Sequence, residues 1–200
     1  MNKEIMKEIL MSDHVVDSII ANLDIISNLI PEIKDMIGFP HHHPHHHLDV
    51  WNHTLLALSF APKDFETRLV LLLHDIGKPH SYQEGEVRHF KGHPEASAKM
   101  AVKILKRLEF DDQETSELCY LIGQHDTPIT IDEINNNKEL AKKKFKVQCC
   151  DALAHHPDKL AKRKAYLLSI NEILNDKEER NKYEEFITNI PSKNKKYIKK

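Results

Sequence analysis

The sequence has little glycine, little cysteine and no long hydrophobic run. Five glycines in 200 residues do not form the G-x-G-x-x-G signature of dinucleotide-binding folds, and Leu72 stands where a P-loop ending at Gly77 would need its first glycine. Three cysteines, two of them adjacent, argue against a disulfide framework and provide no C-x-x-C zinc spacing. The longest apolar run covers only residues 69–73, far less than a membrane span needs. These absences exclude Rossmann and P-loop nucleotide binding, small disulfide-rich scaffolds and transmembrane helices.

The size and charge of the chain favour a single globular domain. At 23.3 kDa it is long enough to bury a core, and its mean hydropathy is −0.54. The N-terminal segment interleaves Glu with Lys and lacks the apolar core of a secretion signal, so we expect a cytoplasmic protein without membrane contact. Residues 1–137 carry 12 basic and 22 acidic side chains, whereas residues 138–200 carry 17 and 9. The Lys-rich end predicts either a surface for a phosphate-rich partner or a solvated tail.

Hydrophobic periodicity predicts an all-α fold, a single compact helical bundle. Apolar residues recur every three or four positions from residue 19 to residue 37, which places them on one helical stripe. At Pro31 the chain either begins a new helix or continues the first one. Further helices are expected over residues 50–60, 64–75, 94–108, 112–123, 138–154 and 158–175. Gly77 is expected in the left-handed conformation that follows a helix. Residues 80–92 have a hairpin-like pattern that turns at Gly85.

Fifteen histidines are the abundant feature, and a few of them fall on positions that should face the core. An apolar run leads directly into His74-Asp75, and Asp151 lies on an otherwise apolar helical stripe. A buried carboxylate is costly unless a cation or hydrogen-bond donors satisfy it. Singly, such residues are usually hydrogen-bonded core histidines or helix caps, but together they predict a metal pocket. The candidate set is His53, His74, Asp75, His93, His125 and Asp151.

The composition of this set indicates the kind of metal. Nitrogen and oxygen ligands without thiolate favour one or two divalent transition metals, Mn, Fe, Co, Ni or Zn, over a structural zinc site. A carboxylate shared by two ions would suit phosphoester cleavage.

The ordered set resembles the H...HD...H...H...D pattern of the HD superfamily of metal-dependent phosphohydrolases. The segments that carry the likeness look most like the HD domain of bacterial CCA-adding tRNA nucleotidyltransferases, over about residues 30–175. These segments are DVWNHTLLAL (49–58), RLVLLLHDIGKP (68–79), HFKGHPEASA (89–98), IGQHD (122–126) and CCDALA (149–154). No paired-carboxylate polymerase motif precedes them, so nucleotide addition is not implied. We expect an N-terminal helical extension (1–29), the HD-type domain (30–176) and a basic C-terminal helix or tail (177–200).

The resemblance implies a role for each member of the set. His53, His74, Asp75 and Asp151 would be the minimal metal ligands, and Asp75 would bridge if a second ion binds. His93 and His125 match the extra ligands of two-metal members, although equivalent positions face the substrate in single-metal members.

Two further residues are candidates for substrate contact. Lys78 matches a basic position after the HD pair and would neutralise a phosphate oxygen, which makes it a catalytic candidate beside Asp75. A cation that stabilises a helix C-terminus is the alternative for Lys78. His46 matches a histidine that often precedes the D-V-W segment in CCA-type relatives, and this position makes it a candidate for substrate contact.

The function that follows is a metal-dependent phosphohydrolase, in which a metal-activated water cleaves a phosphomonoester, a nucleotide or a 2′,3′-cyclic phosphodiester. The expected partners are a small phosphorylated substrate, a nucleotide or an RNA end. A non-catalytic metal- or nucleotide-binding sensor is the main alternative, and a structural helical protein with incidental histidines is the third.

Other histidines have simpler explanations. The HHHPHHH stretch at residues 41–47 is expected to be a solvated connection, or else a metal buffer near the pocket. His155 and His156 fit a normal helix ending. Asp126 either orients a ligating histidine or caps a turn.

Overall fold

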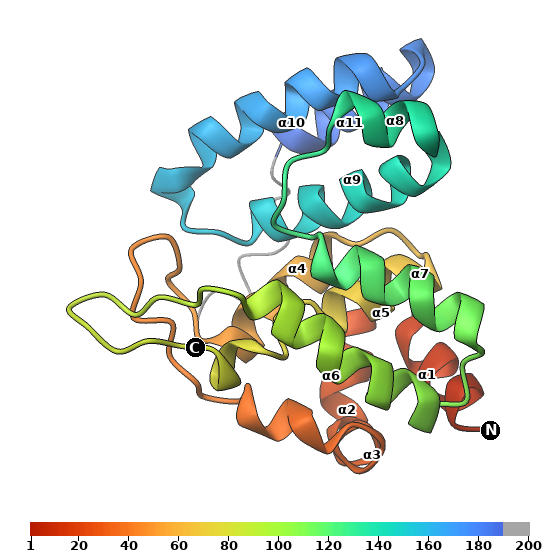
Figure 1. Ribbon diagram of the computed structural model, residues 1–200, viewed down its shortest axis with the longest axis vertical. Coiled ribbons are helices and arrows are strands. Elements are labelled where there is room, and N and C mark those ends of the chain that lie inside the picture. Colours follow the sequence, from red (N-terminus) through yellow and green to blue (C-terminus); the bar gives the residue numbers. More distant parts are fainter. Residues whose placement is uncertain (190–200) are drawn as a thin grey trace.

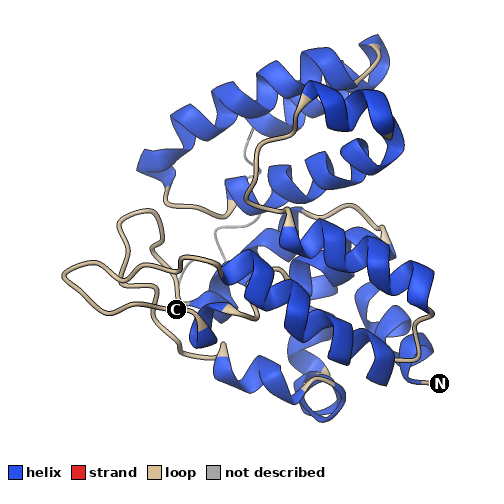
Figure 2. Cartoon of the chain, in the orientation of Figure 1, coloured by secondary structure: helices blue, strands red, loops and turns tan. Residues whose placement is uncertain are grey.

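Helices make up the regular structure of the protein (Figures 1 and 2). The computed structural model describes residues 1–189, and within them there is no strand, which confirms the all-α prediction. The α-helices are α1 (Asn2–Leu10), α2 (Val15–Ala21), α3 (Leu23–Leu29), α4 (Val50–Phe60), α5 (Phe65–Leu73), α6 (His93–Arg107), α7 (Asp112–Gly123), α8 (Ile131–Asn136), α9 (Lys138–Leu153), α10 (Leu160–Leu174) and α11 (Lys177–Thr188). Short 3-10 helices are η1 (Pro31–Asp35), η2 (Lys78–His80) and η3 (Pro157–Lys159).

Aspartates begin several of these helices. The side chains of Asp49, Asp64 and Asp111 each accept a hydrogen bond from the backbone N–H three residues later, at 2.7, 3.1 and 2.8 Å. Each bond satisfies an N–H group that a helix start leaves without a partner. Local sequence therefore places the starts of α4, α5 and α7.

The helices form two packed groups (Figure 1). The N-terminal body, α1–α7, encloses a core in which Met6 and Ile19 join Leu56 and Leu72. The C-terminal layer, α8–α11, has its own smaller core around Phe145. Helix α9 belongs to both, because it packs against α4 and α5 on one side and α10 on the other.

The stripe from residue 19 to residue 37 does not form one helix. The chain turns at Asn22 and again at Ile30, which divides the segment into α2, α3 and η1. Ile19, Ile26 and Ile33 are buried nevertheless, so the apolar spacing identified the buried face. The new start at Pro31 is one of the two alternatives given for that residue, whereas the break at Asn22 was not predicted. Helix α1 lies within the N-terminal segment (1–29) that was expected to be helical, and helix α8 was not predicted.

The prediction for Gly77 is wrong. Its φ is −83°, an ordinary right-handed value, and α5 ends at Leu73, before a turn. The glycine is required for space, because a Cβ there would lie 2.5 Å from the backbone nitrogen of Ser97. This close approach lets the start of α6 lie against the turn that holds His74 and Asp75.

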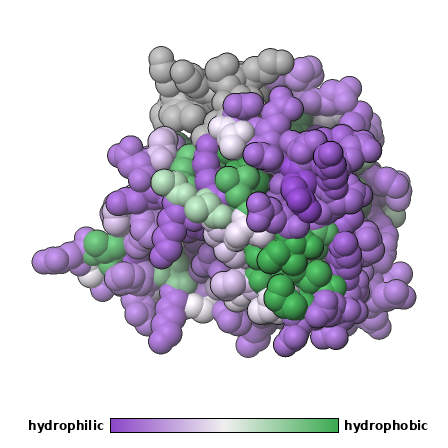
Figure 3. Space-filling model, turned by 90° about the horizontal axis from the view of Figure 1, so that it is seen from above, coloured by the Kyte–Doolittle hydropathy of each residue, from purple (hydrophilic) through white to green (hydrophobic). Residues whose placement is uncertain are grey.

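Three further expectations concern the loop and the ends of the chain. Residues 80–92 form a hairpin-like loop joined by one antiparallel bridge, Gln83 to His89. Of the basic C-terminal segment, α11 is described, and the Lys-rich residues 190–200 lie outside the described residues. None of the helices in residues 1–189 has both the length and the hydropathy to cross a bilayer. The face seen from above is largely hydrophilic, with separate hydrophobic patches (Figure 3).

Candidate metal centre

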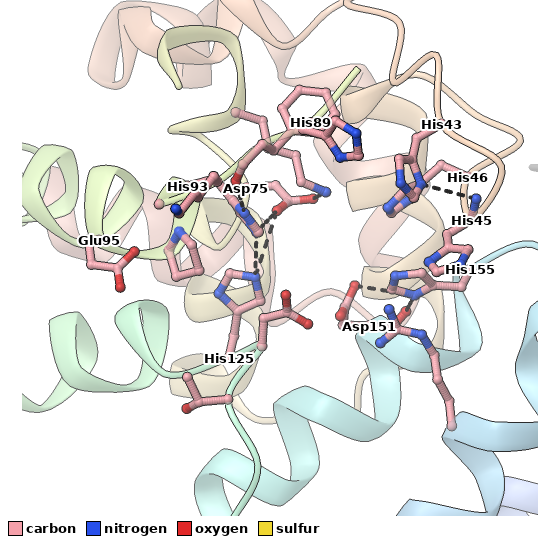
Figure 4. A pocket seen from close by; sticks show the side chains of 18 residues that line it. His43, His45, His46, Asp75, His89, His93, Glu95, His125, Asp151 and His155 are labelled. Carbon is pink, nitrogen blue, oxygen red and sulfur yellow. Dashed lines mark hydrogen bonds and ion pairs between the residues drawn. The ribbon is translucent and has the colours of Figure 1, made fainter. Parts of the chain in front are cut away.

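The six predicted residues come from five helices or the turns beside them, and Figure 4 shows four of them, Asp75, His93, His125 and Asp151, around one pocket. Each lies at a helix end or on an inward face: on α4, in the turn after α5, at the start of α6, just after α7, and on α9. All are buried; they are His53, His74, Asp75, His93, His125 and Asp151.

Asp75 lies at the middle of the cluster. Its Oδ2 atom is 3.3 Å from Nε2 of His74 and 3.6 Å from Nε2 of His53. Its Oδ1 atom faces the other way, 3.3 Å from Nε2 of His93 and 3.8 Å from Nε2 of His125. One carboxylate therefore separates two pairs of imidazoles.

Asp151 completes one of the two sides. Its Oδ1 atom lies 2.8 Å from Nε2 of His53 and 3.6 Å from Nε2 of His74. We call His53, His74 and Asp151 the inner side of Asp75, and His93 and His125 the outer side. The inner side has a second carboxylate, whereas the outer side has only the one it shares.

Backbone carbonyls fix the orientation of all four imidazoles. In each ring Nδ1 faces a carbonyl oxygen, which can only accept, so the neutral ring carries its proton on Nδ1 and directs Nε2 into the cluster. The pairs are His53 with Ala154 at 3.3 Å, His74 with Leu71 at 2.7 Å, His93 with Phe90 at 2.9 Å and His125 with Ile122 at 2.6 Å. Three of the carbonyls lie three residues before the histidine, so the helix ends themselves aim the rings.

The electrostatics of the centre are dominated by burial and by the two carboxylates. Burial lowers the pKa of His74, but Asp75 and Asp151 outweigh it and raise that pKa to about 10. Burial raises the pKa of Asp75 and Asp151, yet the neighbouring cations and imidazoles hold both pKa values well below the usual range. Burial and the nearby His74 lower the pKa of His125 to about 3. The centre thus keeps both carboxylates ionised.

The buried polar atoms of this cluster fit a bound cation. Within residues 1–189, His74 Nε2 and both carboxylate oxygens of Asp75 are buried without a hydrogen-bond partner. Such atoms cost free energy unless something pairs with them. Ligating atoms gather within 4.8 Å in three sets: His53 with His74 and Asp75, His53 with Asp151 and His155, and Asp75 with His93 and His125. With a pKa of about 10, His74 is protonated when no metal is bound, and a bound metal would replace the proton on Nε2. The resulting donor set of imidazole nitrogens and carboxylate oxygens suits a divalent transition metal.

Lys78 faces the centre rather than solvent. It lies in η2, buried, with Nζ 2.7 Å from Asp75 Oδ2 and 3.1 Å from Nε2 of His41. The contact places a positive charge beside the shared carboxylate.

A second group of histidines borders the inner side, and sequence reasoning identified only His46 among them. The ring centroid of His46 lies 4.8 Å from that of His53, 4.6 Å from His155 and 3.8 Å from His41, on which it stacks. Burial lowers the pKa of His41 to about 2 and that of His155 to about 3. His155 does bond a carbonyl of the helix end, that of Asp151 at 2.9 Å, and it also faces the cluster. Its spacing of four residues from Asp151 was the available signal.

A cavity of about 350 Å³ opens onto the cluster. Its rim carries charges of both signs: Lys91 and Arg163, with Glu95 and Asp126. Part of the histidine-rich loop, including His43 and His45, also lines it, so this loop borders the site. Figure 4 shows these histidines on one side of the pocket, with His93 and His125 on the other.

A model of the HD domain matches residues 45–188 of the chain. The chain belongs to this family. HD domains form a superfamily of metal-dependent phosphohydrolases, and this member has histidine and aspartate clusters that could hold a divalent metal.

Three curated proteins are similar to the chain. They are the CC-adding tRNA nucleotidyltransferase of Thermus thermophilus (30% identical over 115 residues, 54% of this chain and 26% of the relative), the Multifunctional CCA protein of Halorhodospira halophila (36% over 88 residues, 42% and 21%), and the A-adding tRNA nucleotidyltransferase of Deinococcus radiodurans (25% over 168 residues, 76% and 38%). The matched segment spans well under half the length of each of these relatives.

Proposed function

We propose that this HD domain is a hydrolase that cleaves a phosphomonoester, a nucleotide or a 2′,3′-cyclic phosphodiester with the help of divalent metal. The observation that supports it is the position of Asp75. This buried carboxylate lies between two pairs of Nε2 atoms. Within residues 1–189 its oxygens have no hydrogen-bond partner, and its one lysine contact is the ion pair between Lys78 Nζ and Oδ2 at 2.7 Å. A cation on each side would satisfy the carboxylate and the histidine lone pairs together.

The ligand assignment follows from the two sides of Asp75. His53, His74, Asp75 and Asp151 would hold one ion, and Asp75, His93 and His125 would hold a second. When bound, such ions polarise a phosphoryl oxygen and supply a nucleophile at neutral pH.

The protein's own groups prepare the cavity for a phosphate ester. The carbonyl bonds to Nδ1 hold the four imidazoles in place before substrate arrives. Lys78 and Arg163 both line the cavity and present positive charge to it, and such charges stabilise an anion that gains charge during reaction. His46, which lines the same cavity, would contact the bound ester.

The charge balance also explains why substrate binding would depend on metal. Asp75, Asp126, Asp151 and Glu95 all line the cavity and together would repel a phosphate. Bound divalent cations are the largest local charges in such a site and reverse this repulsion. An RNA end is a candidate substrate too, since the names of two relatives refer to tRNA.

The test is metal content together with turnover. The protein, purified without a tag, is analysed for bound metal and assayed with Mn, Co, Ni and Mg against phosphomonoesters, nucleotides and 2′,3′-cyclic nucleotides. His74→Ala and Asp75→Asn should lose tightly bound metal and hydrolysis. The matched control is His80→Ala, because His80 is exposed, pairs with Asp35 and does not line the cavity.

Each result has a defined meaning. Hydrolysis by chelator-treated Asp75→Asn protein would contradict the assignment. Tightly bound metal without turnover of any substrate would favour a metal-dependent sensor, and no tightly bound metal would contradict both functions.

A further inference from the structure

A second, smaller cavity opens beside the metal centre. It has a volume of about 160 Å³, less than half that of the main cavity. The two share five lining residues, so they are neighbouring compartments of one site: His125, Asp126, Thr127, Asp151 and Arg163.

Beyond the five shared polar residues, the walls of this side cavity are mostly apolar and are held in place. Pro128, Ala152 and Leu167 line it, together with Tyr166 and Gln148. The polar atoms of the last two are already engaged: Gln148 Nε2 donates to the carbonyl of Thr127 at 2.6 Å, and the Tyr166 hydroxyl donates to Gln148 Oε1 at 3.1 Å. The backbone N–H of Ile129 donates to the same hydroxyl at 2.8 Å. A rigid wall with an aromatic ring suits a flat, weakly polar group.

Arg163 lies where the two cavities meet. It is half-buried on α10, lines both cavities and also lines an outer groove beside Lys159 and Lys162. Within the described part of the chain its side chain makes no hydrogen bond or ion pair, and no other Lys or Arg lines both cavities. A planar guanidinium without a protein partner is well suited to bind a phosphate through two hydrogen bonds.

We infer that the substrate is a nucleotide, either free or at the end of an RNA, whose phosphate contacts Arg163 and whose base enters the side cavity. This inference rests on the proposed function and narrows its substrate class, since a phosphorylated sugar without a base would leave the side cavity unfilled. Two residues that line the side cavity and lie outside the ligand set, Arg163 and Tyr166, would then determine the specificity for nucleotides.

The first experiment removes the guanidinium. Arg163→Gln should raise KM for AMP, or for adenosine 2′,3′-cyclic phosphate, by about tenfold or more, because a charge-assisted hydrogen bond to phosphate is lost. Arg163→Lys should recover part of the loss. Lys162→Gln removes the same charge one residue away, from a side chain that lines only the outer groove, and should change KM less than twofold. Equal effects of Arg163→Gln and Lys162→Gln would overturn the assignment of Arg163.

The second experiment tests the side cavity from both sides. It omits the base from the substrate, and it removes the aromatic ring of Tyr166 that would face the base. The wild-type protein should have a kcat/KM for AMP at least tenfold above that for ribose 5-phosphate, which has the same phosphate and sugar. Tyr166→Leu should reduce this preference severalfold while kcat/KM for ribose 5-phosphate stays nearly constant. Tyr166→Phe keeps the ring and should keep the preference. Equal use of AMP and ribose 5-phosphate by the wild type would overturn the inference and leave the proposed function intact.

If no turnover is found, a binding measurement separates the nucleotide inference from the proposed hydrolase function. In that case the proposed function fails, and calorimetry with AMP and the Mn-loaded wild-type protein decides the inference alone. Binding of AMP but not of ribose 5-phosphate supports it, and equal binding of both, or of neither, overturns it.

Discussion

The N-terminal body and the C-terminal layer contribute very differently to the candidate site. The body supplies His53, the His74-Asp75 pair, His93 and His125, each close to the end of a helix or on an inner face. The layer supplies one member of the set, Asp151, and most of the residues that line the side cavity, including Arg163. The body thus provides most of the metal centre, and the layer provides its last carboxylate and most of the surface that distinguishes substrates.

Helix α9 connects the two groups because both of its faces are buried. Val147 and Cys150 belong to the core of the body, whereas Phe145 and Cys149 belong to the core of the layer. Asp151 lies at this junction, so it reaches the metal centre only when α9 is packed against the body.

The largest expected effect is a loss of activity at Asp151, the one member of the candidate ligand set that the C-terminal layer supplies. Asp151→Asn keeps the shape of the side chain but removes a carboxylate from the inner side, and it should lower kcat/KM by about a thousandfold together with metal content. His125→Ala removes an outer imidazole and should cost about ten- to hundredfold, with loss of the second ion only. Metal stoichiometry and kcat/KM on folded variants check both. Equal losses would show that the inner and outer sides are not distinct.

A substitution at Gly77 in the N-terminal body should destabilise the protein, because it would distort the contact between Gly77 and the start of α6. Gly77→Ala would place a Cβ 2.5 Å from the Ser97 nitrogen and 2.9 Å from Ala96 atoms, so the start of α6 must move, at a cost of about 3 kcal/mol or more. Gly38→Ala is the control, because Gly38 has φ +72° and open space around it and should cost only about 1 kcal/mol. Urea unfolding measures the difference. If Gly77→Ala lost less unfolding free energy than Gly38→Ala, the backbone strain at Gly38 would cost more than the steric contact at Gly77.

A third substitution tests the junction between the two groups. Glu133 of α8 accepts hydrogen bonds from Tyr120 of α7 at 2.6 Å and from the buried Lys144 of α9 at 2.8 Å. Burial raises the pKa of Glu133, but Lys144 and Tyr120 outweigh it and lower that pKa to about 2. Glu133→Gln should therefore destabilise the protein by about 2–3 kcal/mol at neutral pH, because Lys144 loses its counter-charge.

The pH dependence of this effect has a definite sign. A carboxyl with a lowered pKa stabilises the fold fully above its ordinary value of 4.5 and loses that contribution as pH falls toward 2. The difference in unfolding free energy between wild type and Glu133→Gln should shrink over this interval. A difference that stays constant from pH 7 to pH 3 would contradict the role assigned to the pair.

Much of the fold was predictable because its signals are local. The aspartate caps place the starts of α4, α5 and α7, and an apolar run marks the interior of α5. The break at Asn22 was missed because the apolar spacing continues across it, whereas Pro31 had left open whether the helix is interrupted beside Ile30. Helix α8 has six residues, too short for periodicity to reveal.

The second group of histidines could not be predicted in the same way. His41 and His46 stack because the loop at residues 41–47 folds over α4, which no local pattern encodes. Arg163 was not singled out either, since a basic residue on a helix usually faces solvent.

By itself, the sequence determined the all-α class, the family and the six residues of the cluster centred on Asp75. Helix periodicity, caps and spaced motifs depend on residues that are close together in the chain, so they can be recognised without the structure. Only the tertiary structure decided which Asp75 oxygen faces which imidazoles, that Gly77 serves close packing, and that Arg163 lies between two cavities. These features depend on distances between segments far apart in the chain, and such distances are set by how the cores pack rather than by local pattern.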